Sequence, residues 1–593
     1  MLAPDVRTTL LSELAPPPGY TLGHLVATTF TLDLESALLP CLALAGSARA
    51  ESADSVETIA AIRSTIDAID IFHQNGQVVV PAHRSLPFAL LERAIHGITP
   101  DRGLFHPKLW FADYVDDDGD RIVKLIVLTR NLTRDRSWDI TLTLDGAIGT
   151  APSARNKSLV ALLRYLAAAP TTRMSANRSQ RVLGLAERIR YAEWDKPSGV
   201  TDLDFHVFGV PGRPKPRPDF SGYRHLVISP FLNDDGIHRL GEFARETLTV
   251  VSRQEALDGL SAEMAGWIGD AYVLSPTAGI PTDDDETHSD AVLFNGLHAK
   301  LFATERAKRA HLFIGSTNAT GAAFDLNVEI LVELAGSTAV FGVERLLGSE
   351  GIGPLLEKTE IAPGTAPGGE EQHALDSYVR AVAAMPLTAR LEMREDDQID
   401  LHVTSTQAVP TADNAVTMSL SLLSDPSTST TFEAGVELDI MYRGLALTDV
   451  TAFFAISVSD ADERISRTVV KAELVNDIES RLDTIVTREI SNPEAFRRFL
   501  ALLLSFGELG ESPDDESGAA NFGNGQWNHL EQGLFEQLMR AAVAKPAVLD
   551  QLSGVVTAII RNGDPHGVLP DGFRDLWSAI DMATAAERST ADV

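Results

Sequence analysis

The feature that most constrains this 593-residue chain is a short pattern that occurs twice. Each copy has a histidine, a lysine two positions later and an asparagine further on: His106, Lys108 and Asn131, then His298, Lys300 and Asn318. An apolar, β-rich stretch separates lysine from asparagine in both copies. One such pair means little, whereas two predict half-sites that meet in one centre. The histidines are 192 residues apart (298 minus 106), so the repeated unit is domain-sized.

Strand-like and helix-like segments alternate through the first 350 residues, which predicts an α/β fold. We expect two lobes with mixed sheets that form a pseudo-dimer, over residues 1–205 and 206–350, with the Pro-rich basic stretch 211–218 as their link. A Gly/Pro-rich break near 361–372 separates them from a β-rich accessory domain, 351–472. The remaining residues, 473–593, are predicted to be helical and contain no chemical motif.

The composition excludes several classes of protein. Apolar residues make up 44% of the chain and charged residues 22%, as in globular proteins. No apolar run is long enough to span a bilayer; residues 37–48 predict a buried helix instead. The N-terminus lacks the pattern of a secretory signal, and the single cysteine, Cys41, excludes an intrachain disulfide and a Cys-rich zinc site. We therefore expect a cytoplasmic protein with no membrane partner.

The formal net charge of −33 is unevenly distributed. Residues 351–593 carry 17 basic and 39 acidic side chains, which suits a docking module for a protein partner such as a helicase. Residues 151–224 carry 13 basic and 6 acidic side chains. This segment is either a solvated helix surface or an electrostatic track for a polyanion.

The repeated residue types suit chemistry on a phosphodiester. Two lysines neutralise charge on the phosphate oxygens, and two asparagine amides donate hydrogen bonds to them. One neutral imidazole can attack phosphorus and form a phosphohistidine, while a protonated one gives the leaving oxygen its proton. No metal or other cofactor is required, because the lysines supply the positive charge. Ser316 and Thr317 either cap a turn or contact phosphate, and Arg130 is a further candidate for substrate contact.

The paired motifs resemble those of the phospholipase D superfamily over roughly residues 20–345. The second copy keeps the Gly-Ser-x-Asn part of that family's motif, whereas the first reads Thr129-Arg130-Asn131. The family's usual Asp after the lysine is absent in both, which is similar to the His-Lys-Asn branch that includes tyrosyl-DNA phosphodiesterase and some bacterial nucleases. The resemblance implies His106 as the nucleophile. It also implies an acceptor that orients each imidazole: Glu329 in the second lobe, where related nucleases carry Glu, and Asp139 as its match in the first.

These observations predict a metal-independent phosphodiesterase, most simply a nuclease that acts on DNA rather than RNA through a phosphohistidine. By resemblance, a bacterial restriction or antiphage system is the expected setting. One alternative is a non-catalytic protein that binds nucleic acid or acts as a scaffold. Another is a phospholipid hydrolase or transferase, which the strong negative charge disfavours because anionic bilayers would repel it.

Overall fold

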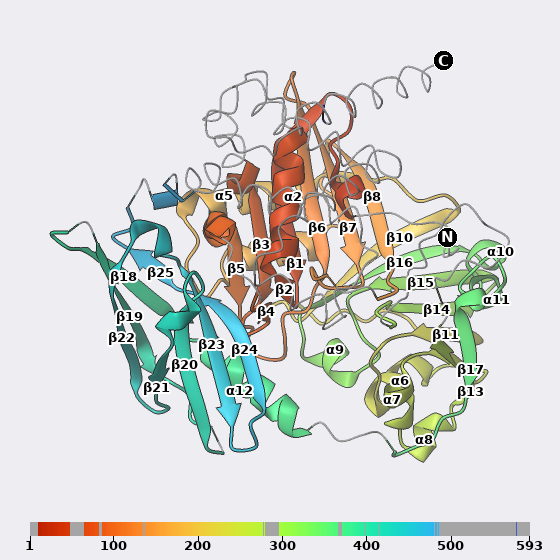
Figure 1. Ribbon diagram of the computed structural model, residues 1–593. Helices are drawn as coiled ribbons and strands as arrows, with labels where there is room; N and C mark the ends of the chain where they lie inside the picture. The colour runs from red at the N-terminus through yellow and green to blue at the C-terminus, as the bar shows by residue number, and fades with distance from the viewer. Residues whose placement is uncertain are drawn as a thin grey trace.

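The computed structural model describes residues 10–47, 65–81, 86–134, 137–276, 278, 296–365, 370–396, 398–412, 414–478, 481, 482, 484, 485 and 577. Two α/β lobes lie side by side, and a β-sandwich flanks the first of them (Figure 1). The α/β fold class and the two-lobed arrangement predicted from the sequence are thus confirmed.

The first lobe is built on a seven-stranded mixed sheet with the order β5-β3-β1-β6-β7-β8-β9. Its strands are β1 (Tyr20–Thr29), β3 (Ile69–Gln74), β5 (Ile95–Ile98), β6 (Leu109–Asp116), β7 (Arg121–Leu128), β8 (Thr141–Ile148) and β9 (Ala192–Trp194). The central β1 is parallel to β3 and antiparallel to β6, which begins directly after the first His-x-Lys motif. Two short strands, β2 (Leu32–Asp33) after β1 and β4 (Val78–Val79) after β3, form a separate parallel pair.

The second lobe repeats this plan in an eight-stranded sheet with the order β10-β16-β15-β14-β11-β12-β13-β17. Its strands are β10 (Val200–Phe208), β11 (Arg224–Ile228), β12 (Leu248–Val251), β13 (Ile268–Leu274), β14 (Leu301–Arg306), β15 (Arg309–Gly315), β16 (Glu329–Ser337) and β17 (Leu356–Thr359). Here β11 is parallel to β12 and antiparallel to β14, which follows the second His-x-Lys motif. Strand β11 is therefore the counterpart of β1, and β14 the counterpart of β6.

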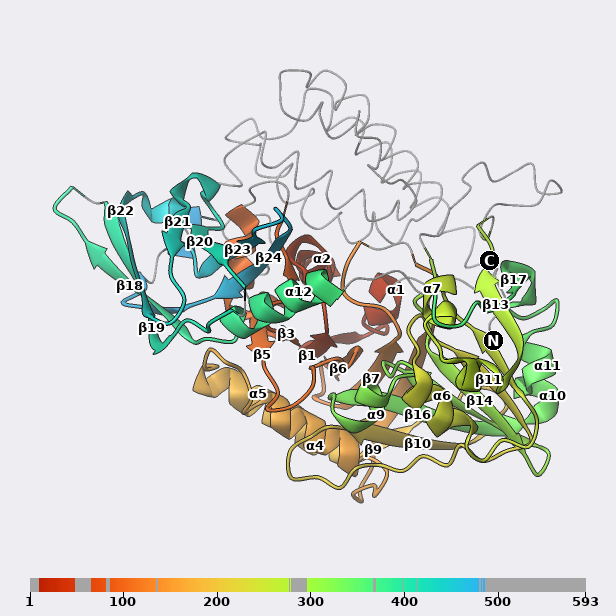
Figure 2. The same ribbon diagram turned by 90° about the horizontal axis from the view of Figure 1, so that it is seen from below.

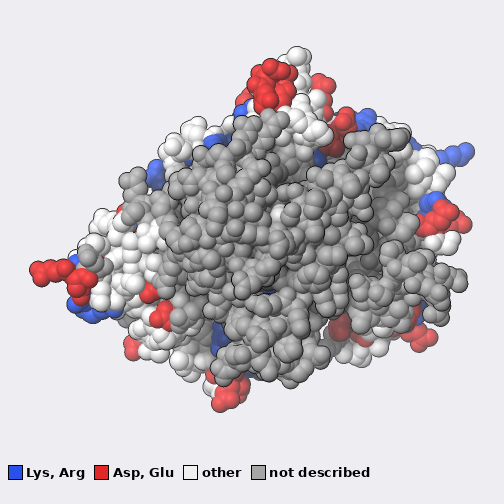
Figure 3. All heavy atoms as spheres, turned by 45° about the horizontal axis from the view of Figure 1, so that its top comes forward, with Lys and Arg blue, Asp and Glu red and all other residues white. Residues whose placement is uncertain are grey.

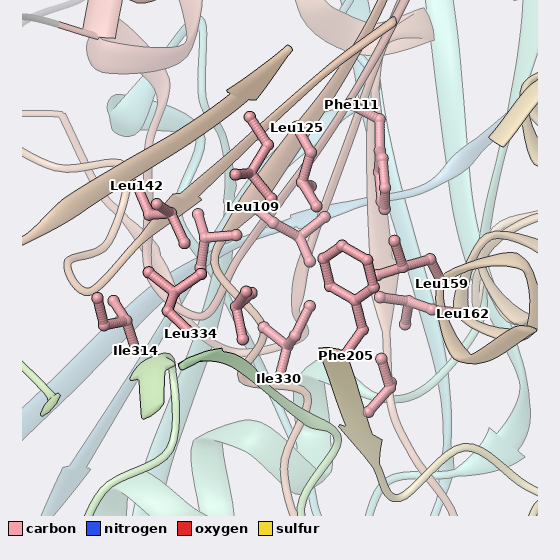
Figure 4. Packing of buried hydrophobic residues seen from close by; sticks show 14 of the residues in the cluster. Leu109, Phe111, Leu125, Leu142, Leu159, Leu162, Phe205, Ile314, Ile330 and Leu334 are labelled. Carbon is pink, nitrogen blue, oxygen red and sulfur yellow. The ribbon is translucent and has the colours of Figure 1, made fainter. Parts of the chain in front are cut away.

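One apolar core joins the two sheets. Leu109, Phe111 and Leu125 of the first sheet point toward Ile330 and residues around it in the second (Figure 4). The helices α4 (Lys157–Leu166) and α5 (Ala176–Arg190) contribute to the same core and lie along one side of the molecule (Figure 2). Since alternate residues of each strand enter this core, the register of every inner strand is fixed by burial. The motifs at the strand ends inherit that fixed position.

The outer faces of both sheets are covered by helices. In the first lobe these are α2 (Leu34–Ser47), which is the helix predicted over 37–48, and the 3-10 helix η1 (Leu86–Arg93). In the second lobe they are the short helices α6 (Asp234–Gly241), α7 (Gln254–Asp258), α8 (Ala262–Ala265) and α9 (Gly321–Asp325). The 3-10 helix η1 ends at Arg93, and β5 begins two residues later at Ile95.

Two predicted boundaries move. The boundary at 205/206 falls inside β10, which pairs with β16 along its whole length and belongs to the second sheet. The link between the lobes therefore precedes Val200, and the stretch 211–218 follows β10 within the second lobe. The strand β17, at the start of the predicted accessory domain, pairs with β13 of the second sheet. Hydrogen bonding across the sheet, which no local pattern encodes, sets both limits.

The accessory domain is a sandwich of two four-stranded sheets with α12 (Glu370–Ala383) packed on it. One sheet has the order β22-β19-β18-β25, from β18 (Leu387–Met393), β19 (Ile399–Ala408), β22 (Glu437–Leu445) and β25 (Glu473–Val475). The other has the order β21-β20-β23-β24, from β20 (Val416–Leu422), β21 (Thr430–Phe432), β23 (Phe453–Asp460) and β24 (Ile465–Lys471). The predicted helical region 473–593 lies almost wholly outside the described residues. None of the described helices combines the length and apolarity that crossing a bilayer requires.

The basic segment 151–224 is largely neutralised by ion pairs. The pairs include Arg155 with Asp202, Arg164 with Glu187, Arg178 with Asp70, Arg188 with Asp113, Lys215 with Asp325, and Arg224 with Glu246. Several of these carboxylates come from outside the segment, so its net charge in the sequence overstates its charge in the fold. On the face shown in Figure 3, basic and acidic side chains are interspersed wherever described residues are visible.

A buried carboxylate fastens the sandwich to the first lobe. Glu92, at the end of η1, accepts hydrogen bonds from Arg481 Nη2 (2.6 Å), Thr451 Oγ1 (2.9 Å) and Ala452 N (2.8 Å). Only 1% of the Arg481 side chain and 5% of the Glu92 side chain are exposed. Lys471 Nζ donates to the Glu92 carbonyl oxygen as well. Asp477 pairs with Arg481 as well, at 2.7 Å, so removing the Glu92 carboxylate would leave the buried guanidinium one counter-charge instead of two, and would leave Thr451 Oγ1 and Ala452 N without their acceptor.

We therefore predict that Glu92→Ala destabilises the protein by about 3–5 kcal/mol, the usual effect of breaking one side of a buried ion pair. Urea unfolding followed by tryptophan fluorescence measures the change. Glu350→Gln is the control, because Glu350 pairs with Arg345 on the surface and should change stability little. Equal midpoints for wild type and Glu92→Ala would show that this contact does not hold the sandwich in place.

Candidate functional site

In each lobe a hydroxyl at the end of one strand is hydrogen-bonded to the turn that contains the motif asparagine. At the end of β1, Thr29 Oγ1 accepts a hydrogen bond from Leu132 N at 2.9 Å, and Leu132 follows the first asparagine. After β11, Ser229 Oγ accepts one from Ala319 N at 3.0 Å, and Ala319 follows the second. In both lobes a hydroxyl oxygen thus accepts a hydrogen bond from the residue after the asparagine, which identifies the lobes as structural repeats.

A second hydroxyl fixes the start of each asparagine turn. Ile140 N donates to Thr129 Oγ1 at 2.8 Å, and Ile330 N donates to Ser316 Oγ at 3.0 Å. Thr129 is therefore the counterpart of Ser316, so the first motif keeps the hydroxyl of the second although its sequence differs. The side chains of both residues are fully buried. This equivalence was missed in the sequence because Thr replaces Ser and Leu128 replaces Gly315.

The lobes exchange backbone contacts next to the motifs. Phe105, just before the first motif, forms a parallel bridge with Val328, just before Glu329. Trp138, just before Asp139, forms the matching bridge with Leu297, just before the second motif. Each histidine is consequently placed beside the acidic residue of the other lobe.

His106, Lys108 and Glu329 form a continuous hydrogen-bonded chain. His106 Nδ1 lies 2.9 Å from the Glu329 carboxylate, and Lys108 Nζ lies 2.8 Å from His106 Nε2. The Ser316 hydroxyl also donates to the Glu329 carboxylate, and Asn327 Nδ2 lies 3.4 Å from its other oxygen. A carboxylate at Nδ1 keeps the proton on that nitrogen, so Nε2 presents its lone pair.

His298 and Lys300 are held by a backbone carbonyl instead. His298 Nδ1 donates to the Thr129 carbonyl oxygen at 2.9 Å, and Lys300 Nζ donates to the same oxygen at 3.1 Å. The His298 Nε2 again carries the lone pair. Because a carbonyl has no net charge, this imidazole lacks the electrostatic support that Glu329 gives to His106.

These contacts correct the prediction that Glu329 and Asp139 are the imidazole acceptors of the second and first lobes: Glu329 holds His106 of the first lobe, and His298 Nδ1 donates to the Thr129 carbonyl oxygen. Asp139 lies at the position that corresponds to Glu329, but its side chain is one methylene shorter. Its carboxylate faces Arg130, with Nε and Oδ2 3.8 Å apart, and the described partner of His298 Nδ1 is Thr129. About a fifth of the Asp139 side chain and a quarter of the Arg130 side chain are exposed.

The two half-sites share one electrostatic environment. Burial comes first in lowering the pKa of His106 well below its usual range, followed by the charges of Lys108 and then Lys300. The pKa of His298 is lowered by burial, then by Lys300 and Lys108. Each motif lysine therefore acts on the histidine of the other lobe, which shows that the motifs adjoin. Burial also lowers the pKa of Lys108 strongly.

Glu329 is affected in the opposite sense. Burial raises the pKa of this carboxyl to about 8, and the charge of Lys108 and the Ser316 hydroxyl offset only part of that rise. Because Glu329, His106 and Lys108 are in contact, the protonation state of each one depends on the other two.

The amide oxygens of the two motif asparagines, Asn131 Oδ1 and Asn318 Oδ1, are buried and unsatisfied among the described residues. A buried amide oxygen without a partner is costly, so such groups typically mark a binding site. By contrast, the hydroxyl of Ser316 is used within the protein, and Thr317 is buried with its Oγ1 3.5 Å from the Ile330 carbonyl oxygen. Of the two roles considered for Ser316 and Thr317, turn capping or phosphate contact, these hydrogen bonds agree with the structural one.

Comparisons with known proteins give matches of fold only. No protein-family model matches the chain, and no curated protein matches its sequence. Two mutant structures of yeast tyrosyl-DNA phosphodiesterase match it at 11% identity, with TM-scores of 0.35 and 0.34, over 56% and 54% of this chain and 86% and 84% of theirs. Phosphatidylserine synthase of Haemophilus influenzae matches at 10% identity with a TM-score of 0.31, over 63% of this chain and 90% of its own. The function proposed below therefore rests on the geometry of the site.

The raised pKa of Glu329 predicts a pH-dependent effect on stability. A carboxyl whose pKa is about 8 in the folded chain and near 4.5 when unfolded favours folding at acidic pH, and this contribution falls as pH rises between those values. Glu329→Gln removes the ionisable group, so relative to wild type the variant should be more stable at pH 8.5 than at pH 5. Urea unfolding at both pH values measures this difference of differences. The same relative stability at both would mean that the carboxyl is not perturbed.

Proposed function

We propose that this protein is a phosphodiesterase that uses its two histidines and two lysines in place of a metal. The observation that carries the proposal is the Glu329–His106–Lys108 chain, which joins residues of both lobes beside His298 and Lys300. A buried imidazole held by a carboxylate is arranged as a nucleophile, and paired lysines suit an anionic reacting group.

The first step follows from these contacts. A phosphodiester between the motifs would draw Lys108 Nζ toward its oxygens and so expose His106 Nε2. The lone pair of Nε2 then forms a bond to phosphorus while the bond from phosphorus to the leaving oxygen breaks. Lys300 and the amides of Asn131 and Asn318 stabilise the charge on the remaining oxygens. Glu329 stabilises the positive charge that develops on the His106 ring.

His298 fits the role of proton donor. Burial and the two lysines lower its pKa. A bound phosphate cancels the effect of the lysines and raises this pKa, so that His298 Nε2 can carry the proton that the leaving oxygen receives. In the second step His298 Nε2, now neutral, accepts a proton from a water molecule. The water oxygen bonds to phosphorus as the bond from phosphorus to His106 Nε2 breaks.

Nucleic acid is the substrate class that we favour, and DNA before RNA. The net charge of −33 opposes adsorption to anionic bilayers, which argues against a phospholipid substrate. A place in a restriction or antiphage system, and a helicase or similar partner for the acidic residues 351–593, stay proposals that follow from the resemblance and the charge distribution.

We predict that the protein cleaves end-labelled DNA in excess EDTA. His106→Ala should lower the rate by at least about a thousandfold, and Lys300→Ala by about 100- to 1,000-fold through loss of charge stabilisation. His402→Ala is the matched control, because His402 lies on the sandwich and pairs with the exposed Asp439. In the covalent intermediate the labelled DNA would be bound to the protein. An acid-labile, alkali-stable protein–DNA bond in wild type but not in His106→Ala would identify the phosphohistidine.

Two results would contradict this function. Activity that disappears with EDTA and returns with Mg²⁺ would replace the metal-free mechanism. Tight DNA binding without turnover, unchanged in His298→Ala, would support the non-catalytic alternative that the short Asp139 side chain leaves open.

The pH dependence gives an independent check. The Glu329 carboxylate must be ionised to hold the His106 Nδ1 proton, and its folded pKa is about 8. We therefore expect kcat/KM to rise with pH through an apparent pKa near 8 and this limb to vanish in Glu329→Gln. An unchanged profile in the variant would assign the limb to another group.

A further inference from the structure

An exposed aromatic ring lies at the rim of the second half-site. Phe231 follows β11 in the turn whose Ser229 hydroxyl holds the residue after Asn318, and Ser229 Oγ donates to the Phe231 carbonyl oxygen at 2.6 Å. The Phe231 side chain is 49% exposed, which is unusual for a phenylalanine. Its backbone is thus fixed beside the site while its ring faces solvent.

The fold does not require an aromatic residue there. In the first lobe the same turn is closed by Thr29 Oγ1, which donates to the Thr31 carbonyl oxygen at 2.7 Å. Thr31 is therefore the counterpart of Phe231, and a threonine serves this turn equally well. The first lobe places Phe30 differently: its ring lies 5.1 Å from the His106 ring and is partly buried. The exposed ring is thus a feature of the second half-site, without a structural demand behind it.

Arg253 stacks on this ring and is anchored to the second motif. Its guanidinium carbon lies 4.9 Å from the centroid of the Phe231 ring, and Nε and Nη2 donate to the Leu297 carbonyl oxygen at 3.2 and 3.0 Å. Leu297 is the residue before His298. Among the described residues Arg253 has no ion-pair partner, so its charge is not cancelled by a described carboxylate. A fixed ring and a cation without a described counter-ion therefore adjoin the proposed phosphate position.

We propose that Phe231 and Arg253 form a binding site for one unpaired nucleotide next to the scissile phosphate, with the base stacked on Phe231 and its phosphate facing Arg253. The inference rests on the proposed function and narrows its substrate to single-stranded nucleic acid. A base within a duplex has both faces covered by its neighbours, whereas an unpaired base can stack on a protein ring. A lipid acyl chain would gain nothing from the adjoining guanidinium. A nucleotide offers both a flat base for the ring and an anionic phosphate for the cation, so these contacts favour a nucleotide.

The test compares two single-stranded oligonucleotides, one with a normal base next to the cleaved phosphate and one with an abasic residue there. Phe231→Ala should lower kcat/KM on the normal strand by about 5- to 100-fold, as expected for the loss of one stacked base. It should not change kcat/KM on the abasic strand. Phe231→Trp should retain wild-type rates on both.

Phe243→Ala is the matched control. Phe243 is 64% exposed, but the next residue, Ala244, bridges Gly222 before the start of β11, at the end of the sheet away from His298. This variant should leave both rates unchanged. An equal loss on both strands in Phe231→Ala, or no loss on either, would overturn the base-binding role.

A binding arm separates this inference from the proposed function. Fluorescence anisotropy of the same strands is measured with His106→Ala, alone and combined with Phe231→Ala, so no turnover is needed. If wild type cleaves neither strand, a 5- to 100-fold weaker Kd for the normal strand alone in the double variant would still support the site. If His106→Ala binds the normal and abasic strands equally, the site does not exist, whatever the enzyme's activity.

Discussion

The site depends on the crossed backbone pairing between the lobes. The bridge between Phe105 and Val328 places the carboxylate of one lobe on the imidazole of the other. Without that bridge Glu329 would be a buried carboxylate with no imidazole, and His106 would lie at a strand end with no fixed tautomer. Neither lobe alone contains the hydrogen-bonded chain. The large apolar core between the sheets is thus the physical reason that two short motifs become one site.

This arrangement is energetically unfavourable because it buries ionisable groups away from water. Lys108 and Lys300 are 0% and 1% exposed, and Glu329 is fully buried beside them. Burying two lysines beside a single carboxyl group is unfavourable, so the site depends on the strands that fix its groups. On the proposed function, the phosphate of the substrate would add negative charge between the lysines. The arrangement therefore suits an anionic substrate better than it suits the stability of the fold.

Local patterns predicted the parts of the fold that burial alone determines. The strands after each motif are apolar because both faces of each sheet are covered, and α2 has an apolar surface for the same reason. The sequence did not reveal that β10 crosses the predicted boundary, because its partner β16 lies more than a hundred residues away. Partners distant in sequence also explain the neutralised basic segment. The motif residues were found because they repeat, whereas Thr129, Phe231 and Arg253 do not repeat as residue types and left no signal.

The departure from symmetry explains how one duplicated site can perform two roles. The turns of both lobes are held by equivalent hydroxyls, so the frame is the same in each. The side chains of Glu329 and Asp139 differ by one methylene, and their contacts differ as well. Glu329 reaches the imidazole of His106 in the other lobe, whereas Asp139 faces Arg130 and His298 donates to the Thr129 carbonyl oxygen. An imidazole held by a carboxylate tolerates the positive charge that a covalent bond to phosphorus creates. One held by a neutral carbonyl releases its proton more readily, as a donor to the leaving group must. On the proposed function, the difference in acceptor suits His106 to attack and His298 to proton transfer, although both lobes have the same backbone frame.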